Sequence, residues 1–417
     1  MTATMTVPMA GSPDGIPLRI KLQRVERWRK LRSFTLVMPL LLVILIAFVW
    51  PIGRMMFNSV HDDTLLRLMP RATSALSTWD TKDLPDESAY TALVEDLKQA
   101  WIHKTTGAIA TRINYELAGA GSQIASSARK ANTLSAGPYK AALIEINPLW
   151  GQRDVWRVIK RGHSAYTGYY LLRSFDYQYG PEGQVVASPP ENAIFRDVFL
   201  RTFSISIGVT ALTLLLGFPV AYLLATLPAR TSNLLMIMVI LPFWTSGLVR
   251  TAAWGVLLQE HGVINEVLMA LHITSSPAAL IFNRIGTIVA MTHIQLPVTL
   301  LPIYSVMKTI SPSYVRAARS LGAGPFYAFW KVYFPQTLPG IAAGCLLTFI
   351  LCLGYYLTPA LVGGPADQMV SYFVAHYTNE ELNWGMASAL GAILLVATLL
   401  LYHVYNKLVG VDRLKMG

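Results

Sequence analysis

Long apolar runs constrain this chain of 417 residues more than any other feature of its sequence. The hydrocarbon core of a bilayer is about 30 Å thick, and a helix needs about 20 consecutive apolar residues to cross it. Because no water reaches that core, a spanning segment must satisfy its own backbone hydrogen bonds, as an α-helix does. The runs of sufficient length are Phe34–Ile52, Phe199–Leu227, Leu234–Trp254, Ile285–Met307, Ile341–Val362 and Gly385–Val409. The sequence therefore predicts an all-α polytopic membrane protein with six transmembrane helices.

The distribution of charge predicts how these helices are oriented. The formal net charge is +11, yet residues 58–197 hold nearly equal numbers of acidic and basic side chains. The basic excess therefore lies near the chain ends and in short loops, which is typical of cytoplasmic segments of membrane proteins. This pattern predicts that both termini are cytoplasmic, that 58–197 lies outside and that 308–340 lies inside. It is an orientation signal rather than a nucleic-acid-binding surface.

The same features divide the chain into five parts. Residues 1–33 are predicted to be a cytoplasmic tail with an amphipathic helix, and 34–57 to contain the first transmembrane helix. Residues 58–197 are predicted to form an inserted extracytoplasmic domain, because this polar segment has the length of a small domain. Residues 198–409 are predicted to form a core with transmembrane helices 2–6, and 410–417 a cytoplasmic tail.

The inserted segment has the pattern of an α+β lobe. Helical patterns begin after Pro85, near Ile109 and near Gln152. The aromatic stretch Tyr166–Tyr179 favours strand, and residues 180–183, Gly-Pro-Glu-Gly, favour a turn. The aromatic cluster is interpreted either as the core of a small domain, which is the simpler reading, or as a ligand site.

Sequence patterns typical of enzymes are missing. There is no GxxxxGK[ST] phosphate loop and no local signature of a hydrolytic triad, and the histidines do not fall at metal-ligand spacing. Cys345 and Cys352 lie seven residues apart in an apolar run and are expected to be small buried residues. We therefore expect a non-catalytic chain without a cofactor or metal of its own.

A short basic stretch, Ser311–Ile341, suits a docking element between two membrane helices. Its first helix is predicted to begin at Pro312 after a Ser N-cap and to end at Gly322, where glycine permits a turn. Small side chains at Ala317 and Ala318 would let the backbone of another protein approach closely. The alternative is an ordinary cytoplasmic loop.

A second helical segment is predicted to follow in the same stretch. It begins at Pro325 and runs to about Val332, and Pro335 and Pro339 are expected to break it before the next span. Its aromatic edge consists of Phe326, Phe329, Trp330 and Tyr333.

This stretch resembles the conserved cytoplasmic EAA loop of the membrane subunits of ATP-binding-cassette importers. The positions that fit the pattern are Ala317, Ala318, Gly322, Ala323, Pro335, Leu338, Pro339, Gly340 and Ile341. Arg316 stands where the family has Glu, and Phe334 stands where it has Leu, so a particular salt bridge at 316 is in doubt. The segments Leu200–Phe203 and Leu241–Ser246 are similar to parts of spermidine/putrescine-type permeases.

The resemblance covers about half of the chain and implies a permease subunit of an ATP-driven importer. It implies the ABC importer permease fold, with the α+β lobe inserted between helices 1 and 2. Its implied partners are two ATPase subunits, which bind ATP and Mg, a second permease subunit and an extracytoplasmic solute-binding protein. The implied location is the bacterial inner (plasma) membrane. The implied ATPase-coupling loop, within 308–340, contains Arg316, Ala317, Ala318, Gly322, Ala323 and Pro335.

The substrate that this family suggests is a polyamine such as spermidine or putrescine, or a related compound. The candidate residues of the translocation path are Trp244, Thr245, Tyr355 and Tyr356. Aromatic faces attract cations, although aromatic residues in helices also serve in packing. No Asp or Glu falls at mid-depth in the predicted spans, which argues against a proton-coupled carrier and deprives a polyamine of carboxylate partners.

Two other functions remain open from the sequence. A membrane sensor would bind its ligand in the outer lobe, but no cytoplasmic output domain is predicted. A channel or secondary carrier would work without an ATPase, so recovery of an ATPase with the chain distinguishes it from an importer.

Overall fold

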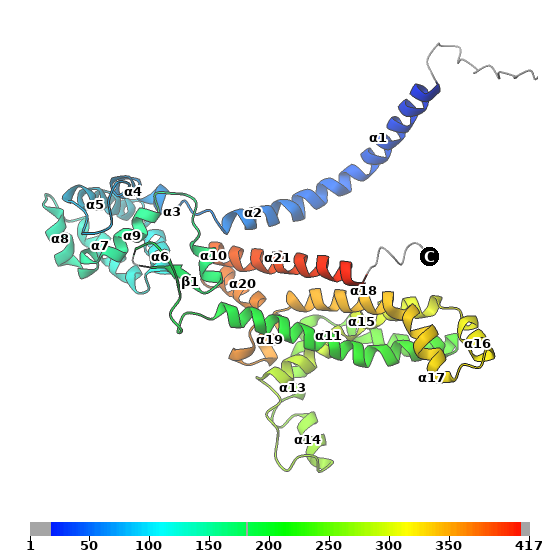
Figure 1. Ribbon diagram of the computed structural model, residues 1–417. Helices are drawn as coiled ribbons and strands as arrows, with labels where there is room; N and C mark the ends of the chain where they lie inside the picture. Colours follow the sequence, from blue (N-terminus) through cyan, green and yellow to red (C-terminus); the bar gives the residue numbers. More distant parts are fainter. Residues whose placement is uncertain (1–17, 181, 410–417) are drawn as a thin grey trace, which may run out of the picture. The chain divides into compact units, whose positions relative to one another are not determined.

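The computed structural model describes residues 18–180 and 182–409, which are mostly helical (Figure 1). Residues 1–17 of the tail expected at 1–33, and the whole tail expected at 410–417, lie outside the described residues. The chain divides into two compact units, Met1–Phe57 and Asn58–Gly417, and each is described by itself.

The first unit is a long helix with one widened turn. Helix α1 (Leu18–Ile44) leads into the π-helical turn η1 (Leu45–Val49) and then into α2 (Trp50–Asn58) without interruption. The expected amphipathic segment is thus continuous with the first span. The π turn directly precedes Pro51, whose missing N–H leaves a carbonyl one turn earlier without its usual donor. Residues Glu26–Asn58 are long and apolar enough to cross a membrane.

The lobe, residues 58–194, opens the second unit and consists of short helices with one hairpin. Its helices are α3 (Thr64–Leu68), α4 (Pro70–Ala75), α5 (Glu87–Ile102), α6 (Thr106–Glu116), α7 (Ala120–Ala131), α8 (Tyr139–Ile146), η2 (Pro148–Gly151), α9 (Arg153–Arg161) and α10 (Tyr169–Ser174). Strands β1 (Tyr177–Tyr179) and β2 (Val185–Ala187) pair antiparallel. The predicted helices after Pro85, near Ile109 and near Gln152 are confirmed as α5, α6 and α9, and the turn at 180–183 joins the strands.

The strand predicted across Tyr166–Tyr179 is wrong for most of its length. Only Tyr177–Tyr179 is strand, and α10 occupies the middle of the stretch. Adjacent side chains Tyr169 and Tyr170 are both buried, a pattern that a helix against a second helix allows and an edge strand does not. Tertiary packing therefore overrides the β propensity of these aromatic residues.

The lobe has its own hydrophobic core around two tryptophans. Trp150 and Trp156 are fully buried together with Tyr90. Their polar atoms are satisfied, because the Tyr90 hydroxyl donates to the Trp150 carbonyl at 2.7 Å and the Trp156 indole N–H donates to the same oxygen at 3.0 Å. This core is separate from the aromatic cluster of α10, and it explains how the lobe packs without disulfides.

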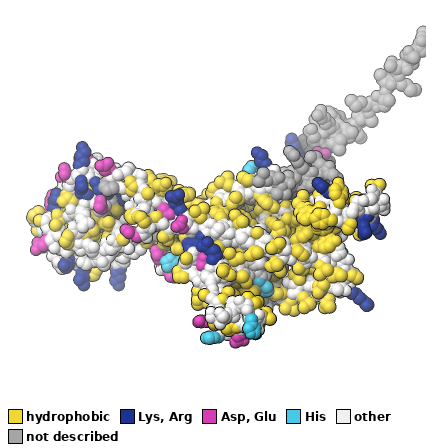
Figure 2. Space-filling model, turned by 60° about the horizontal axis from the view of Figure 1, so that its bottom comes forward, with side chains coloured by type: hydrophobic (Ala, Val, Ile, Leu, Met, Phe, Trp, Pro, Cys, Tyr) yellow, Lys and Arg dark blue, Asp and Glu magenta, His cyan; other side chains and the backbone are white. Residues whose placement is uncertain are grey.

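The helical core follows the lobe. Its elements are α11 (Phe195–Thr226), α12 (Ala229–Ile240), η3 (Leu241–Trp244), α13 (Gly247–Leu257), α14 (Val263–Ala270), α15 (Arg284–Thr309), α16 (Pro312–Ser320), α17 (Pro325–Ala328), η4 (Phe329–Tyr333), α18 (Phe334–Leu353), α19 (Leu357–Val362), η5 (Pro365–Asp367), α20 (Val370–Asn379) and α21 (Trp384–Val409). Hydrophobic side chains cover most of the core face seen in Figure 2, whereas the lobe surface mixes charges of both signs.

Helices α11, α15 and α18 pack side by side at the centre of the core (Figure 1). Three buried threonines join them: the Thr299 hydroxyl lies 2.8 Å from that of Thr213 and 2.6 Å from that of Thr348. Small residues allow the helices to approach, as at Gly344, where a Cβ would meet the Thr299 carbonyl. Hydroxyl pairs and small residues are the usual contacts between membrane helices.

Two of the predicted spans differ from the structure. The described residues contain five helices able to cross a membrane, or six if a bent pair counts as one span. That pair is the predicted run Leu234–Trp254, in which Ala229–Trp244 and Gly247–Leu257 meet at 95°. The predicted run Ile341–Val362 is displaced, because the long helix extends from Pro325 to Leu353 and α19 is separate.

The prolines expected to separate the second helical segment from the next span do not break the helix. Helix α17, the π turn η4 and α18 follow one another directly, with Pro335 and Pro339 inside α18. The π turn ends just before Pro335, as η1 ends just before Pro51. Proline lacks the N–H of the usual helical hydrogen bond, and the altered bonding of the π turn accommodates this loss. The helix therefore carries the chain from the docking stretch into the membrane without a hinge.

Candidate functional site

The docking stretch has the local structure that its sequence predicts. Helix α16 starts after Ser311, whose hydroxyl accepts the Ser313 N–H at 3.3 Å. It ends at Leu321, and Gly322 follows with φ +88°, a conformation that glycine adopts without steric cost. Pro325 then begins α17.

The residues expected to couple to an ATPase form an exposed surface. Arg316, Ala317, Gly322 and Pro335 are exposed, and Ala318 and Ala323 are half-buried. Between them the structure adds an apolar tip, where Leu321 is 90% and Phe326 is 77% exposed. Large apolar side chains that are exposed together on a short segment are typical of a surface that another protein covers. Leu321 therefore joins the candidate site.

The aromatic edge of this stretch points in two directions. Phe326 and Trp330 are exposed, whereas Phe329 and Tyr333 face α11. The Tyr222 ring of α11 lies 5.6 Å from that of Phe329 and 5.4 Å from that of Tyr333, both edge to face. These ring contacts fix η4 on α11. The docking stretch therefore contacts α11 through η4 and is continuous with α18.

The four candidate path residues lie at two interruptions of the helices. Trp244 and Thr245 fall at the bend between η3 and α13, and Trp244 is 81% exposed. Tyr355 and Tyr356 fall between α18 and α19, with Tyr355 half-buried and Tyr356 exposed. They are thus in irregular backbone rather than within straight helices.

The structure brings these two interruptions together. A Cβ on Gly247 would stand 3.3 Å from the Tyr355 hydroxyl, and the Thr251 and Thr358 hydroxyls lie 3.0 Å apart in a buried contact between α13 and α19. Irregular backbone inside a membrane protein is tolerated where it is buried in protein or lines a cavity. This region therefore brings the exposed aromatic side chains Trp244 and Tyr356 to the two interruptions of the helices.

Polar residues beside the bend extend this region. The Arg250 guanidinium lies 5.1 Å from the Phe243 ring centroid, and its Nε and Nη1 have no hydrogen-bond partner among the described residues. The Trp254 indole N–H donates to His293 Nδ1 at 3.1 Å. The sequence reasoning did not select Arg250 and His293 as site residues. Their position within apolar segments was the signal that could have identified them, since ionisable residues at membrane depth usually have a function.

No metal site is found in the part of the chain that the structure describes, where no three His, Cys, Asp or Glu side chains converge. Cys352 is buried with its sulfur 3.7 Å from the Gln295 amide nitrogen, and Cys345 is half-buried. Both cysteines are free, which agrees with the expectation of packing residues.

Comparison with known proteins identifies a family over the second half of the chain. Residues 213–410 match the model of the family described as binding-protein-dependent transport system inner membrane component. The lobe lies outside this match.

Relatives of known name cover a similar share of the chain. The spermidine/putrescine transport system permease protein PotB of Haemophilus influenzae is 33% identical over 222 residues, which are 52% of this chain and 78% of that protein. PotB of Escherichia coli is 30% identical over 212 residues, 51% of this chain and 77% of that protein. The inner membrane ABC transporter permease protein YdcU of Escherichia coli is 30% identical over 267 residues, 58% of this chain and 81% of that protein.

Among solved structures, a bacterial ABC transporter for import of the acidic polysaccharide alginate matches with a TM-score of 0.39 and 20% identity, over 52% of this chain and 78% of that one. The sequence relatives are decisive for the family, because the H. influenzae protein is matched over most of its own length. This chain belongs to the family of inner membrane components of binding-protein-dependent transport systems.

Proposed function

We propose that this chain is the permease subunit of an ATP-driven importer and forms the path for a polyamine such as spermidine or putrescine. The observation that carries the proposal is the identity of 33% with a spermidine/putrescine permease over 78% of that protein. The family supplies the role in transport, and the name of this relative supplies the substrate class.

The exposed helix α16 is the proposed ATPase-binding element. Arg316, Ala317 and Ala318 form its outer surface, and Leu321 with Gly322 forms its tip. Two ATPase subunits would bind ATP and Mg, so the chain itself is non-catalytic. The proposed complex also contains a second permease subunit and an extracytoplasmic binding protein.

The length of α11 supports opposite locations for the lobe and α16. Asp176 of the lobe accepts N–H bonds at the start of α11, whereas Tyr222, near its end, contacts η4. A helix of 32 residues is about 48 Å long, which exceeds the hydrocarbon thickness. With α16 on the cytoplasmic side, the lobe is extracytoplasmic and both termini are cytoplasmic.

The paired helix interruptions are the proposed path. The long helices α15, α18 and α21 contain no Asp or Glu, and α11 has only Asp197, in its first turn. A polyamine would therefore depend on aromatic faces. Trp244, Tyr355 and Tyr356 supply such faces at the interruptions, and Thr245 lies beside Trp244.

Affinity purification and uptake test this function. The native chain should recover an ATPase and support spermidine uptake when its operon partners are present. Gly322→Asp should lose both while the chain remains in the membrane, because a side chain is strained at φ +88° and places a charge at the α16 tip. Gly119→Asp is the matched control, with φ +83° and open space around its Cβ, but in the lobe.

The outcomes separate the importer from its alternatives. Loss of the ATPase with Gly322→Asp but not with Gly119→Asp supports the coupling role. Uptake that persists after ATPase removal would instead indicate a secondary carrier. ATPase recovery with uptake of another solute, and none of spermidine, would retain the importer and reject the polyamine.

A further inference from the structure

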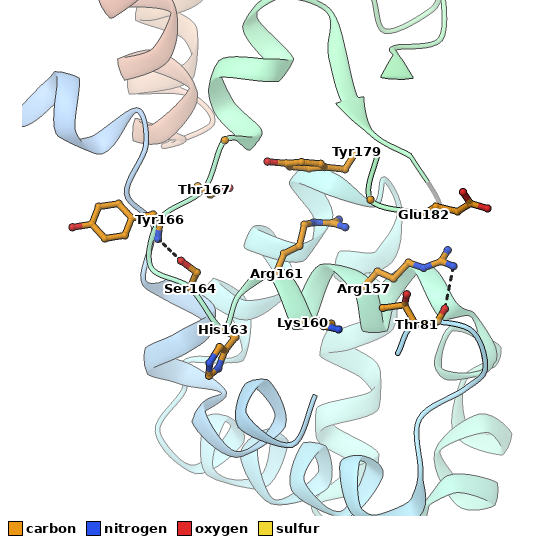
Figure 3. Close-up of a pocket in the computed structure, with 12 residues that line it drawn as sticks. Thr81, Arg157, Lys160, Arg161, His163, Ser164, Tyr166, Thr167, Tyr179 and Glu182 are labelled. Carbon is orange, nitrogen blue, oxygen red and sulfur yellow. Dashed lines mark hydrogen bonds between the residues drawn. The ribbon is translucent and has the colours of Figure 1, made fainter. Parts of the chain in front are cut away.

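The lobe contains a cavity of about 480 Å³ that the transport function does not use (Figure 3). Helix α9 forms one wall, the turn between β1 and β2 forms another, and loop residues 163–168 complete it with Thr81. Sites for small molecules commonly have volumes of about 300–1,000 Å³. The cavity lies outside the residues that the family model matches.

One wall of the cavity is basic. Arg157, Lys160 and Arg161 stand at helical spacing on α9 and line the cavity, and Figure 3 shows Arg157 and Arg161 extending from the helix toward the side of Tyr179 and Glu182. Arg161 is occupied, since its guanidinium lies 2.6 Å from a Glu116 carboxylate oxygen and 5.0 Å from the Tyr179 ring centroid. The side chains of Lys160 and Arg157 have fewer hydrogen-bond and ring contacts than that of Arg161.

Lys160 has no acidic partner among the described residues. Its ammonium donates to the Trp79 carbonyl, which leaves two N–H groups and the whole positive charge without a counter-ion. The side chain is half-buried, so solvent compensates only part of that charge.

Arg157 provides a second donor. Its Nη1 lies 3.0 Å from Asp154, and its Nη2 donates to the Thr81 carbonyl at 3.3 Å. The side chain is only 11% exposed, and its Nε is buried without a hydrogen-bond partner in the described structure. A buried N–H without an acceptor costs free energy that a ligand oxygen would recover.

We propose that this cavity binds a small anionic solute with carboxylate or phosphate groups, held by Lys160 and Arg157. Tyr166 and Tyr179 add aromatic surface at the cavity wall. A concave cavity of this volume suits a small-molecule ligand better than it suits a partner protein with a flat surface. The basic wall disfavours the polyamine itself, so the site is distinct from the proposed path, and the proposal stands whether or not the transport function holds.

Calorimetric titration of the full chain in lipid nanodiscs tests the site. Citrate and inorganic phosphate are the anionic probes, and spermidine is the cationic one. Saturable binding is expected for at least one anion and not for spermidine, and the affinity should fall as the salt concentration rises from about 20 to 200 mM.

Three variants locate the site. Lys160→Gln should raise the Kd by about tenfold or more, because a charged hydrogen bond is lost. Lys140→Gln is the matched control: Lys140 also donates to a lobe carbonyl, that of Pro85 at 3.0 Å, but lies outside the cavity. Glu182→Gln should lower the Kd, since this exposed cavity residue repels an anion and its removal does not disturb the fold.

Lys160→Gln is expected to raise the Kd and Glu182→Gln to lower it. Misfolding can only weaken binding, so it cannot explain both results. Absence of saturable binding of both anions to the native chain would overturn the proposal. So would equal weakening by Lys160→Gln and Lys140→Gln, which would indicate a general effect of net charge. Competition by spermidine for the same site would assign the cavity to cations and reject an anionic ligand.

Discussion

The Arg112 guanidinium is the centre of the polar contacts within the lobe. It is 7% exposed, pairs with Asp62 and lies 2.9 Å from a Glu116 oxygen, while the Tyr170 hydroxyl donates to Asp62 at 2.7 Å. Burial alone would raise the pKa of Asp62, but Arg112 and hydrogen bonds from Thr64 and Tyr170 hold this pKa below its usual value. Asp62 is thus ionised and stabilising in the folded lobe at neutral pH.

Asp62→Asn should lower the free energy of unfolding of the lobe by about 3 kcal/mol at pH 7, because it removes one of the two carboxylates that pair with the buried Arg112 guanidinium and leaves only Glu116. Folding lowers the Asp62 pKa, so this contribution is complete above the unfolded pKa of about 3.9 and is lost as the pH falls below it. The difference between variant and native chain should therefore shrink below about pH 4. Denaturant unfolding followed by tryptophan fluorescence across pH measures it.

The pair Asp154–Arg157, whose carboxylate is exposed to solvent, supplies the control for this measurement. Asp154 is 60% exposed, so Asp154→Asn should change the free energy of unfolding by less than about 1 kcal/mol. A loss from Asp62→Asn no larger than this would show that the buried pair does not stabilise the lobe.

Gly385, at the start of α21, lies against the Tyr170 ring of the lobe. A Cβ at this position would overlap the ring, which is held by its hydrogen bond to Asp62 and therefore cannot move freely. Gly385→Ala should cost about 1–3 kcal/mol and lower the Tm of the chain. Gly255→Ala, in α13 with open space at its Cβ, should leave the Tm unchanged or raise it.

A second substitution tests the stated cause. Tyr170→Leu should restore part of the stability lost in Gly385→Ala, because the smaller side chain makes room for the methyl group. Equal loss in the single and double variants would place the effect elsewhere than in this contact.

At the scale of elements, helix ends were predictable where a local residue pattern sets them. Ser311 with Pro312 and the later Gly322 define α16, and Pro85 precedes α5, because caps and turns depend on neighbours in the sequence. The bend at Trp244–Gly247 also has a local signal, because the Ser246 hydroxyl accepts the Val249 N–H at 3.2 Å and caps α13. The prediction of one straight span followed the apolar character of the whole run instead.

In the candidate sites, too, some features follow from the local sequence and others depend on contacts between distant residues. The sequence predicted a helix from Pro312 that ends at Gly322, and α16 is found there, but the exposure of Leu321 depends on what α16 packs against. Tyr355 and Tyr356 were assigned to a straight span and instead lie at its interruption. The prolines misled the prediction because the π turn η4, which ends just before Pro335, keeps the helix continuous, and the sequence pattern does not indicate a π turn.

Leu321→Ala tests the apolar tip of α16. The side chain is 90% exposed, so its loss should leave the Tm unchanged, while ATPase recovery should fall by about fivefold or more if Leu321 fills a pocket on that partner. Leu271→Ala, at an exposed position after α14, is the control. Equal recovery of the ATPase with both variants would remove Leu321 from the binding surface.

At the scale of the whole molecule, the lobe and the helical core share a hydrophobic contact. Tyr170 of α10 packs with Phe195, Met386 and Leu390 of the core, and Asp176 caps α11. The sequence predicted a separate inserted domain from its polarity, but nothing in that pattern indicates which lobe residues pack on the membrane helices. Such contacts join residues about 200 positions apart.

Deletion of 64–187 should therefore reduce the recovery of folded chain, because it exposes the apolar residues under α10 and removes the α11 cap. Size-exclusion chromatography of a fluorescent fusion measures monodisperse recovery. Recovery equal to that of the native chain would mean that the contact between lobe and core adds little to stability, and that the lobe is an independent accessory.

The three threonines between α11, α15 and α18 have a mechanical consequence. Thr299 is hydrogen-bonded to both neighbours, so sliding one helix along another breaks buried bonds, whereas tilting about that point preserves them. The cluster thus favours tilting of these helices about Thr299 over sliding. We expect a displacement of η4 to be accompanied by an opposite displacement at the far end of α18, which is followed by Tyr355 at the next interruption.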